Sequence, residues 1–440
     1  MKALLILCFL MINQSNLKLL SKSDYDYSSY KANITNQHVK EQIVTSKNID
    51  ESAVYITGNT EEYDISDSTI RKIEGNSSDL NISELYGVNA AILVQGGTLE
   101  FKRGKIETKA KGAYALVATN EAKVTISRQS TINSTADISA GGLHTTYGGS
   151  IEASEMNIIT YGELSPAISS EKEGQKIRCK DCTLSTKGKG SPLANSAGDI
   201  ILKNSEGFAE GAQIAVIKGT NTFEIDRHIN SGFKCSASPS RGEIDQCGFM
   251  IYQSEDSTGR VIFKCQDSLM EIINTSPYYQ TAPMFFVTNT NAFIILEHDN
   301  QFKFGSNIFL SVKGTDIWGE KGKNGGNVTL SLKGQNIEGD FIVDNISYLT
   351  LILEGSSIIG TINPGKMAKK LVISMRDGSS ITLKGNSYYT EFYNDEKDGS
   401  NLINGSFTWT KYNDDSNSNN SANFCYNTNL ILLILSIILL

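Results

Sequence analysis

Short runs of alternating apolar and polar residues recur along the chain. One run starts at a glycine or glycine-like residue and continues with aliphatic residues, as in 89–94, 112–117 and 211–216. From residue 89 to residue 211 its successive starts lie 23, 29, 24, 26 and 20 residues apart. Between them lie two more alternating runs per repeat, such as 97–101 and 104–108. Alternation over three to five residues, bounded by Gly, Asn, Ser or Asp, predicts three short β-strands in each repeat.

Three short strands per 20 to 30 residues is the period of a parallel β-helix, in which the chain winds into stacked coils. Each coil lies roughly 4.8 Å from the next, so about ten or eleven coils give a rod on the order of 50 Å long. Val, Ile, Leu and Ala would fill the interior, and Asn or Ser at the corners would bond backbone groups. The alternative, a β-sandwich, requires antiparallel hairpins and does not explain a repeated three-strand unit.

The two ends of the chain carry patterns typical of targeting signals. Lys2 precedes ten apolar residues, 3–12, which is typical of a secretory signal peptide. The apolar run Leu430–Leu440 has 11 residues, whereas a membrane-spanning helix needs roughly 20. Small and short polar residues at 416–422, a spacer and this tail form the attachment signal for a glycosylphosphatidylinositol (GPI) lipid.

We therefore expect a secreted protein held by a lipid on the outer leaflet of the plasma membrane. Asn420 is the expected lipid-attachment residue, with Asn419 and Ser421 as alternatives. The predicted organisation is a signal peptide (1–15), an N-terminal leader or cap (22–51), the β-helix (52–410), a flexible stalk with the lipid-attachment region (411–423) and a cleaved hydrophobic tail (424–440).

Composition supports an extracellular all-β protein. The net charge is −8 and no basic block is present, so nucleic acid is not expected as a partner. Proline is scarce at 6 residues while glycine reaches 38, and strand-forming residues dominate. In a secreted eukaryotic chain, Asn-x-Ser/Thr triplets are potential N-glycosylation sites. After the predicted signal peptide these triplets start at Asn33, Asn76, Asn81, Asn133, Asn274, Asn327, Asn345, Asn404 and Asn419.

Five cysteines lie between the two terminal signals. Four of them, Cys179, Cys182, Cys235 and Cys247, are candidates for disulfide bonds in an oxidising compartment, and Cys265 remains over. Cys179 and Cys182 are close enough in sequence for a local bond, which we favour over a redox or zinc motif. A bond between Cys235 and Cys247 would close a Ser-, Pro- and Gly-rich loop.

Four stretches resemble known proteins: 87–97, 142–149, 283–290 and 318–327. From about residue 85 to 385 the chain resembles secreted parallel β-helix proteins of the pectin-lyase-like superfold. More narrowly, it is similar to bacterial surface β-helix proteins described as adhesin-like or carbohydrate-binding. The resemblance implies an all-β, right-handed, single-stranded parallel β-helix with loop excursions. The bacterial pattern has Arg-Gly-Leu-Asp where this chain reads Gly141-Gly-Leu-His144, which removes the Arg and Asp that a charged or metal-assisted site would use.

No catalytic, metal-binding or cofactor-binding residues are predicted. Glycoside hydrolysis needs two acids roughly 5–10 Å apart, whereas the acids of the repeats are scattered among lysines, as on a solvated face. The candidates for glycan contact are His144 and Tyr147 in a Gly-rich turn, and Trp318 before a loop. For the first two the favoured alternative is a turn histidine with a packed tyrosine, and for Trp318 it is a ring that covers the coil.

The favoured function is a non-catalytic, GPI-anchored surface rod that contacts glycans, matrix or host cells. A rigid solenoid offers an extended surface at little ordering cost. The main alternative is a polysaccharide lyase or glycoside hydrolase of the pectin-lyase-like superfold. A purely structural coat protein or variable antigen is the third hypothesis.

Overall fold

The structure is a computed structural model that describes residues 38–58, 62–171, 174–226, 232–239, 246–255, 259–395 and 402–413. The signal peptide, Asn33, the three lipid-attachment candidates and the hydrophobic tail lie outside these residues, as does the stalk from residue 414 on. Those expectations therefore stay predictions.

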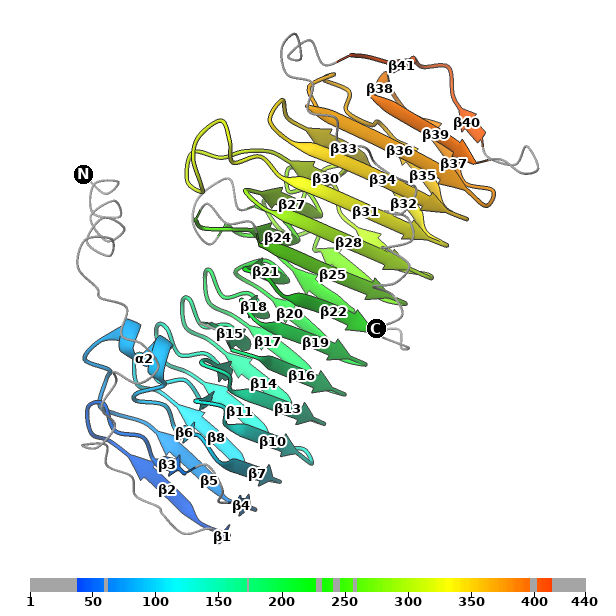
Figure 1. The fold of residues 1–440 in the computed structure, drawn as a ribbon. Coiled ribbons are helices and arrows are strands. Elements are labelled where there is room, and N and C mark those ends of the chain that lie inside the picture. The colour runs from blue at the N-terminus through cyan, green and yellow to red at the C-terminus, as the bar shows by residue number, and fades with distance from the viewer. Residues whose placement is uncertain are drawn as a thin grey trace.

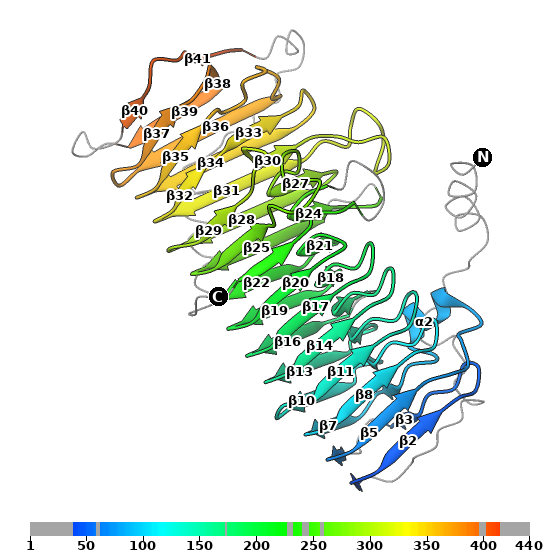
Figure 2. The ribbon, with the colours of Figure 1, turned by 180° about the vertical axis from the view of Figure 1, so that it is seen from behind.

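The chain winds into an elongated stack of coils whose strands all pair in parallel (Figures 1 and 2). Over most of its length each strand pairs with the strand three places later in the chain, so each coil contributes one strand to each of three sheets. This confirms the predicted parallel β-helix.

The first sheet runs the whole length of the rod. Its strands, in order, are β1 (His38–Lys40), β4 (Glu62–Ser66), β7 (Thr98–Lys102), β10 (Lys123–Ser127), β13 (Ser150–Ser154), β16 (Lys176–Lys180), β19 (Asp199–Lys203), β22 (Thr222–Asp226), β25 (Arg260–Gln266), β28 (Asn291–Glu297), β31 (Asn327–Lys333), β34 (Tyr348–Glu354), β36 (Lys370–Arg376) and β39 (Glu391–Asp395).

The second sheet forms the next side of the coil. It contains β2 (Ile43–Ser46), β5 (Thr69–Lys72), β8 (Lys105–Thr108), β11 (Thr131–Ser134), β14 (Asn157–Thr160), β17 (Thr183–Thr186), β20 (Glu206–Ala209), β23 (Phe233–Cys235), β26 (Leu269–Ile272) and β29 (Gln301–Lys303). A fourth sheet takes its place in the last coils, with β32 (Asn336–Glu338), β35 (Ser357–Gly360), β37 (Ser380–Leu383) and β40 (Leu402–Asn404).

The third sheet completes the coil. It contains β3 (Val54–Thr57), β6 (Ile92–Gln95), β9 (Leu116–Thr119), β12 (Leu143–Thr145), β15 (Ile168–Ser170), β18 (Ala194–Ser196), β21 (Ala215–Lys218), β24 (Phe249–Tyr252), β27 (Phe285–Thr288), β30 (Ile308–Val312) and β33 (Asp340–Val343). Near the C-terminal end, β38 (Ser387–Tyr389) and β41 (Trp409–Lys411) form a fifth sheet. The one described α-helix, α2, spans Leu80–Tyr86.

The first sheet has 14 strands, so the rod has more coils than the ten or eleven expected. At about 4.8 Å per coil its length is about 60 Å. Part of the difference lies at the start of the chain. Residues 22–51 were expected to form a leader or cap, but β1 and β2 lie in this range and pair with β4 and β5. The β-helix therefore already begins at residue 38.

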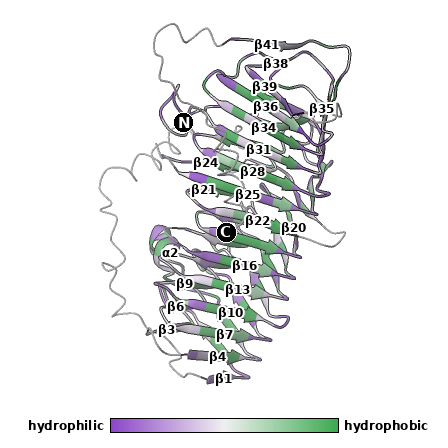
Figure 3. Cartoon of the chain, turned by 45° about the vertical axis from the view of Figure 1, so that its right-hand side comes forward, coloured by the Kyte–Doolittle hydropathy of each residue, from purple (hydrophilic) through white to green (hydrophobic). Residues whose placement is uncertain are grey.

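The core is a single column of stacked side chains inside the coils. In the first sheet Leu99, Val124, Ile151 and Ile177 follow one another in register, each almost wholly buried. Hydrophobic residues follow the strands while hydrophilic residues gather at the turns (Figure 3). Near the middle of the rod the column widens to aromatic rings. Phe263 has its ring centre 5.9 Å from that of Phe223 and 5.2 Å from that of Phe285.

Hydroxyl side chains fill the inward position at the end of five second-sheet strands: β2, β8, β11, β14 and β17. Thr108 and Ser134 lie in register there, and the Thr108 hydroxyl donates to Ser134 Oγ at 2.8 Å. Ser134 Oγ in turn donates to the Ala140 carbonyl at 2.5 Å. These bonds satisfy backbone groups at the corner, as expected for corner residues. In β5 the same position is held by Lys72, whose fully buried ammonium donates to the Asn48 carbonyl and to Ser46 Oγ. Burial lowers the pKa of Lys72 to about 8.

The predicted disulfide bonds are not seen. Among the described residues no disulfide bond joins Cys179, Cys182, Cys235, Cys247 and Cys265, and all five are buried. The physical reason is that several occupy core positions: Cys179 lies in register between Ala153 and Leu202. A buried thiol packs as a small hydrophobic group, which fits these positions without a partner.

Replacing Phe263 with alanine tests the stacked core. We expect the free energy of unfolding to fall by about 3–5 kcal/mol, because the ring leaves a cavity between two neighbouring coils. Replacing its outward neighbour Lys264 with alanine is the matched control, with an expected change within about 0.5 kcal/mol. Urea unfolding followed by circular dichroism measures both; equal losses would contradict the inward placement of Phe263.

Candidate functional site

The outer face of the third sheet is the most distinctive surface of the rod. In β9, β12, β15, β24 and β27 every residue is buried, whereas strands of the other two sheets alternate between buried and accessible residues. A strand buried on both faces is one that other segments cover. The outward side chains here are therefore packed beneath further parts of the chain.

Helix α2 covers the N-terminal part of this face. Its N-cap, Asp79, accepts a hydrogen bond from the Asn81 amide at 2.8 Å. The helix ends at Gly87, whose φ of 73° is a left-handed conformation that glycine adopts readily. A Cβ atom at Gly87 would lie 2.6 Å from Val117 Cγ1, so this end of the helix lies directly on the outward side chains of the sheet.

His144 joins this helix to the sheet. Its side chain is completely buried, with Nε2 2.7 Å from the Glu84 carbonyl oxygen and Nδ1 2.7 Å from Ser169 Oγ. A carbonyl can only accept, so Nε2 carries the proton and Nδ1 accepts from the Ser169 hydroxyl. The ring also stacks on Tyr114 with 4.4 Å between ring centres. Burial lowers the pKa of His144, which therefore stays neutral at pH 7.

The other two predicted glycan contacts are buried as well. Tyr147 is 8 % exposed and stacks on Tyr86 of α2 with ring centres 5.5 Å apart. Trp318 is 6 % exposed and lies against Tyr252, with ring centres 4.7 Å apart. His144 and Tyr147 are therefore not exposed as a glycan contact would require. Tyr147 is packed, as in the favoured alternative, whereas His144 lies in strand β12 and not in a turn. Trp318 packs over the outside of the third sheet, in a cluster with Val216, Met250 and Phe286.

Between these two covered regions the outward residues become polar. Glu171 Oε1 accepts hydrogen bonds from Asn195 Nδ2 at 3.0 Å and from Lys218 Nζ at 2.7 Å. These three residues form the polar cluster of the third sheet. Asn195 is half-buried, and the Lys218 and Glu171 side chains are 23 % and 11 % exposed. The cluster thus lies at the boundary between the packed face and solvent.

The polar cluster is held in place by the sheet. Asn195 and Lys218 lie on adjacent strands, β18 and β21, and Glu171 directly follows the neighbouring strand β15. Although burial alone would lower it, the pKa of Lys218 is raised, because the Glu171 carboxylate lies against its ammonium. The cluster therefore presents a fixed cation, a fixed anion and an amide. These groups donate and accept hydrogen bonds in fixed directions, as sugar hydroxyls require.

This cluster could not be predicted from the sequence. Glu171 lies in the run Glu-Lys-Glu at 171–173, which is typical of a solvated turn. Its partners follow 24 and 47 residues later and meet it only because the coils are stacked.

The described asparagines of the glycosylation triplets are all exposed: Asn76, Asn81, Asn133, Asn274, Asn327, Asn345 and Asn404.

Tyr278 and Tyr279 are partly buried against the main core. Among the described residues no group of three or more His, Cys, Asp or Glu side chains is placed to hold a metal ion. The described part of the chain likewise contains no helix long and apolar enough to cross a membrane.

No protein-family model, curated protein or solved structure matches this chain. The parallel pairing of the strands supports the architecture that the resemblance implied. A kinship with pectin-lyase-like or adhesin-like proteins stays a prediction.

The burial of His144 predicts that stability falls between pH 7 and pH 5. The folded state disfavours protonation, whereas a histidine in the unfolded chain takes up a proton below about pH 6.5. Acidification therefore favours unfolding. In His144→Gln, which has no titratable ring, we expect a weaker dependence of the urea midpoint on pH over this range.

His298 provides the matched control for this measurement. Its side chain is 60 % exposed beside Asp267, far along the rod from α2. His298→Gln should keep the pH dependence of the original chain. A His144→Gln variant whose midpoint still falls as steeply as that of the original chain would contradict the buried neutral imidazole.

Proposed function

We propose that this protein is a secreted, GPI-anchored cell-surface rod with a non-catalytic role in contacting glycans on a matrix or host surface. The terminal sequence patterns support secretion and lipid anchoring. The exposure of all seven described glycosylation-triplet asparagines fits a chain that passes through the secretory pathway.

The observation that carries the glycan-contact role is the polar cluster of Glu171, Asn195 and Lys218. A rigid sheet fixes all three side chains, so little conformational entropy is lost when a ligand binds. Sugar hydroxyls can accept from Lys218 and Asn195 and donate to Glu171. Buried apolar and aromatic side chains support the cluster, with Val216 in register with Asn195 and Tyr252 in register with Lys218. Such mixed surroundings are typical of sites that bind small polar ligands.

The alternative is a polysaccharide lyase or glycoside hydrolase. The observation in its favour is the same Glu171 carboxylate, which has a cation and an amide within hydrogen-bond reach. Hydrolysis would need a second acid at a suitable separation. Release of unsaturated or reducing products from a panel of uronans and neutral glycans, lost in Glu171→Gln, would favour this alternative.

Lipid anchoring predicts that phosphatidylinositol-specific phospholipase C releases the protein from intact cells. The lipid that this enzyme cleaves would be the only covalent link to the bilayer after removal of the tail. An epitope tag between the signal peptide and residue 38 allows the released fraction to be measured by immunoblotting. A control chain ending at residue 423 should appear in the medium without treatment; a tagged protein that stays on the membrane after phospholipase treatment would contradict the anchor.

Glycan contact predicts binding on a glycan array that depends on the polar cluster. Removing one charged hydrogen-bond partner costs about 1.5–3 kcal/mol, so Lys218→Met should weaken binding about ten-fold or more. The phospholipase-released protein is the sample.

Lys203→Met is the matched control. Lys203 lies on the first sheet, in the same coil as Lys218, and forms an ion pair with Asp226 of the next coil. It should leave array binding unchanged. Absence of binding to every glycan would instead favour a purely structural coat or antigen role, and an equal loss in both variants would contradict a specific role for the cluster.

A further inference from the structure

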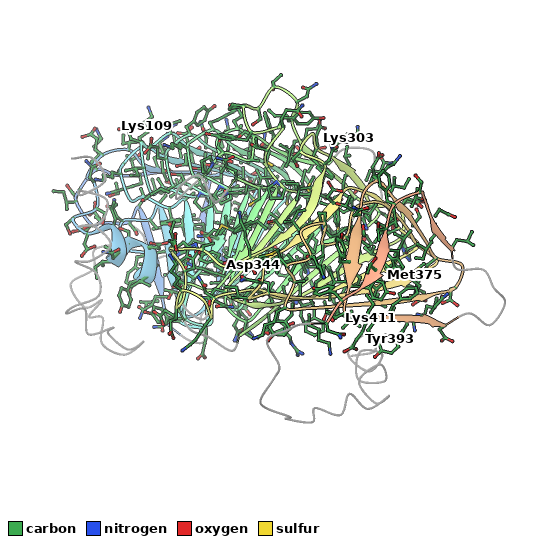
Figure 4. All side chains as sticks on the ribbon, turned by 90° about the horizontal axis from the view of Figure 1, so that it is seen from above. Lys109, Lys303, Asp344, Met375, Tyr393 and Lys411 are labelled. Carbon is green, nitrogen blue, oxygen red and sulfur yellow. The ribbon has the colours of Figure 1, made fainter. Side chains whose placement is uncertain are left out.

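The last coil of the rod exposes an unusual number of large hydrophobic side chains. Tyr393 on β39 is 55 % exposed, Leu402 on β40 is 52 % exposed, and Phe407 before β41 is 47 % exposed. Tyr393 lies with Lys411 at the C-terminal end of the rod (Figure 4). Single exposed apolar residues are common on proteins, but here three surround one coil, with Tyr393 and Leu402 pointing outward from two different sheets.

The interior of the rod also opens at this end. Three aromatic rings pack against one another here: those of Tyr389, Phe392 and Trp409. The ring centres of Tyr389 and Trp409 are 4.8 Å apart, and those of Phe392 and Trp409 are 5.6 Å apart. These rings and Ile403 are only partly buried against the core. β39, β40 and β41 are the last strands of their sheets, so no further coil covers the rings within the described residues.

We propose that this C-terminal coil rests on the headgroup region of the lipid bilayer. The contact surface consists of Phe392, Tyr393, Leu402, Phe407 and Trp409. This inference rests on the proposed lipid anchor. Asn413 is the last described residue, and the expected attachment residue Asn420 follows seven residues later. Seven residues span at most about 25 Å, so the anchor keeps this end of the rod close to the membrane.

The chemistry of the coil fits a lipid surface. Trp and Tyr are enriched where membranes meet water, because their rings are apolar and their N–H or O–H groups remain hydrated. The charged neighbours do not favour an anionic membrane, since Glu391 pairs with Lys370 at 2.7 Å and Lys411 and Asp395 carry opposite charges. The expected partner is therefore a zwitterionic phosphatidylcholine surface.

This contact would fix the orientation of the whole molecule. A rod that stands on its last coil holds β21 and the polar cluster seven coils above the membrane, or about 35 Å at 4.8 Å per coil. The glycan-contact residues on the side of the rod would then lie clear of the lipid headgroups.

The two tryptophans of the chain allow a direct test. Trp409 lies in the last coil. Trp318 belongs to the segment that connects β30 to β31 and is buried several coils away. The sample is the mature lipid-anchored protein reconstituted into phosphatidylcholine vesicles, with and without brominated acyl chains. Bromine quenches tryptophan fluorescence only at close range. In the Trp318→Phe variant, which retains Trp409, we expect emission to fall at least two-fold in brominated vesicles.

Trp409→Phe, which retains Trp318, is the matched control and should show no quenching. A further variant, Leu402→Ser with Phe407→Ser in the Trp318→Phe background, should reduce quenching while circular dichroism stays unchanged. An N-glycan at Asn404 on β40 would hold the coil away from the lipid, so we expect peptide mass spectrometry to find this residue unmodified.

The outcomes separate the inference from the proposed function. Protein that does not float with the vesicles contradicts the anchor itself. Protein that floats while Trp409 and Trp318 are quenched equally, or neither is quenched, overturns the membrane contact alone. If Trp409 is unquenched and the phospholipase-released protein is oligomeric, the exposed coil instead docks on a second copy through its open strand edges.

Discussion

Parallel pairing between successive coils is the constraint on which the rest of this structure depends. Backbone hydrogen bonds hold neighbouring strands about 4.8 Å apart, so a residue in one coil lies directly against the residue in register in the next. An inward position can therefore hold only a side chain that packs on its two neighbours. The series Leu99, Val124, Ile151, Ile177, Ile200 and Phe223 meets this condition along the first sheet. The same constraint places Lys72 among hydroxyl groups, where its ammonium finds oxygen acceptors.

The constraint leaves the outward positions free, and the three sheets use this freedom differently. In the first two sheets accessible side chains alternate with buried ones along most strands. The third is covered by α2 at one end and by the segment with Trp318 at the other. Between these covers Asn195 and Lys218 reach the surface from the sheet itself. The location of the polar cluster thus follows from where the covering segments end.

The architecture was predictable because its signal is local and repeated. The runs at 97–101 and 104–108 became β7 and β8 with a shift of one residue at most. The three-residue strand β1 is too short for alternation to identify it, so the first coil was mistaken for a leader. The burial of His144 depends on α2, which lies 60 residues earlier and has only seven residues, too few for a helical period. The disulfide prediction relied on the compartment, whereas the position of each thiol in the core depends on register between distant strands.

The energetics of the polar cluster bear on why it exists. Partial burial of Glu171 and Lys218 removes both charges from water, and their mutual attraction offsets this cost only in part. The outward positions of neighbouring strands hold Val117, Val216 and Met250, so apolar side chains fit this face and would keep the rod stable. Stability therefore gives no reason for an ion pair at this point of the sheet. A ligand that hydrogen-bonds to both charges does give one, because it replaces the water that the fold has removed.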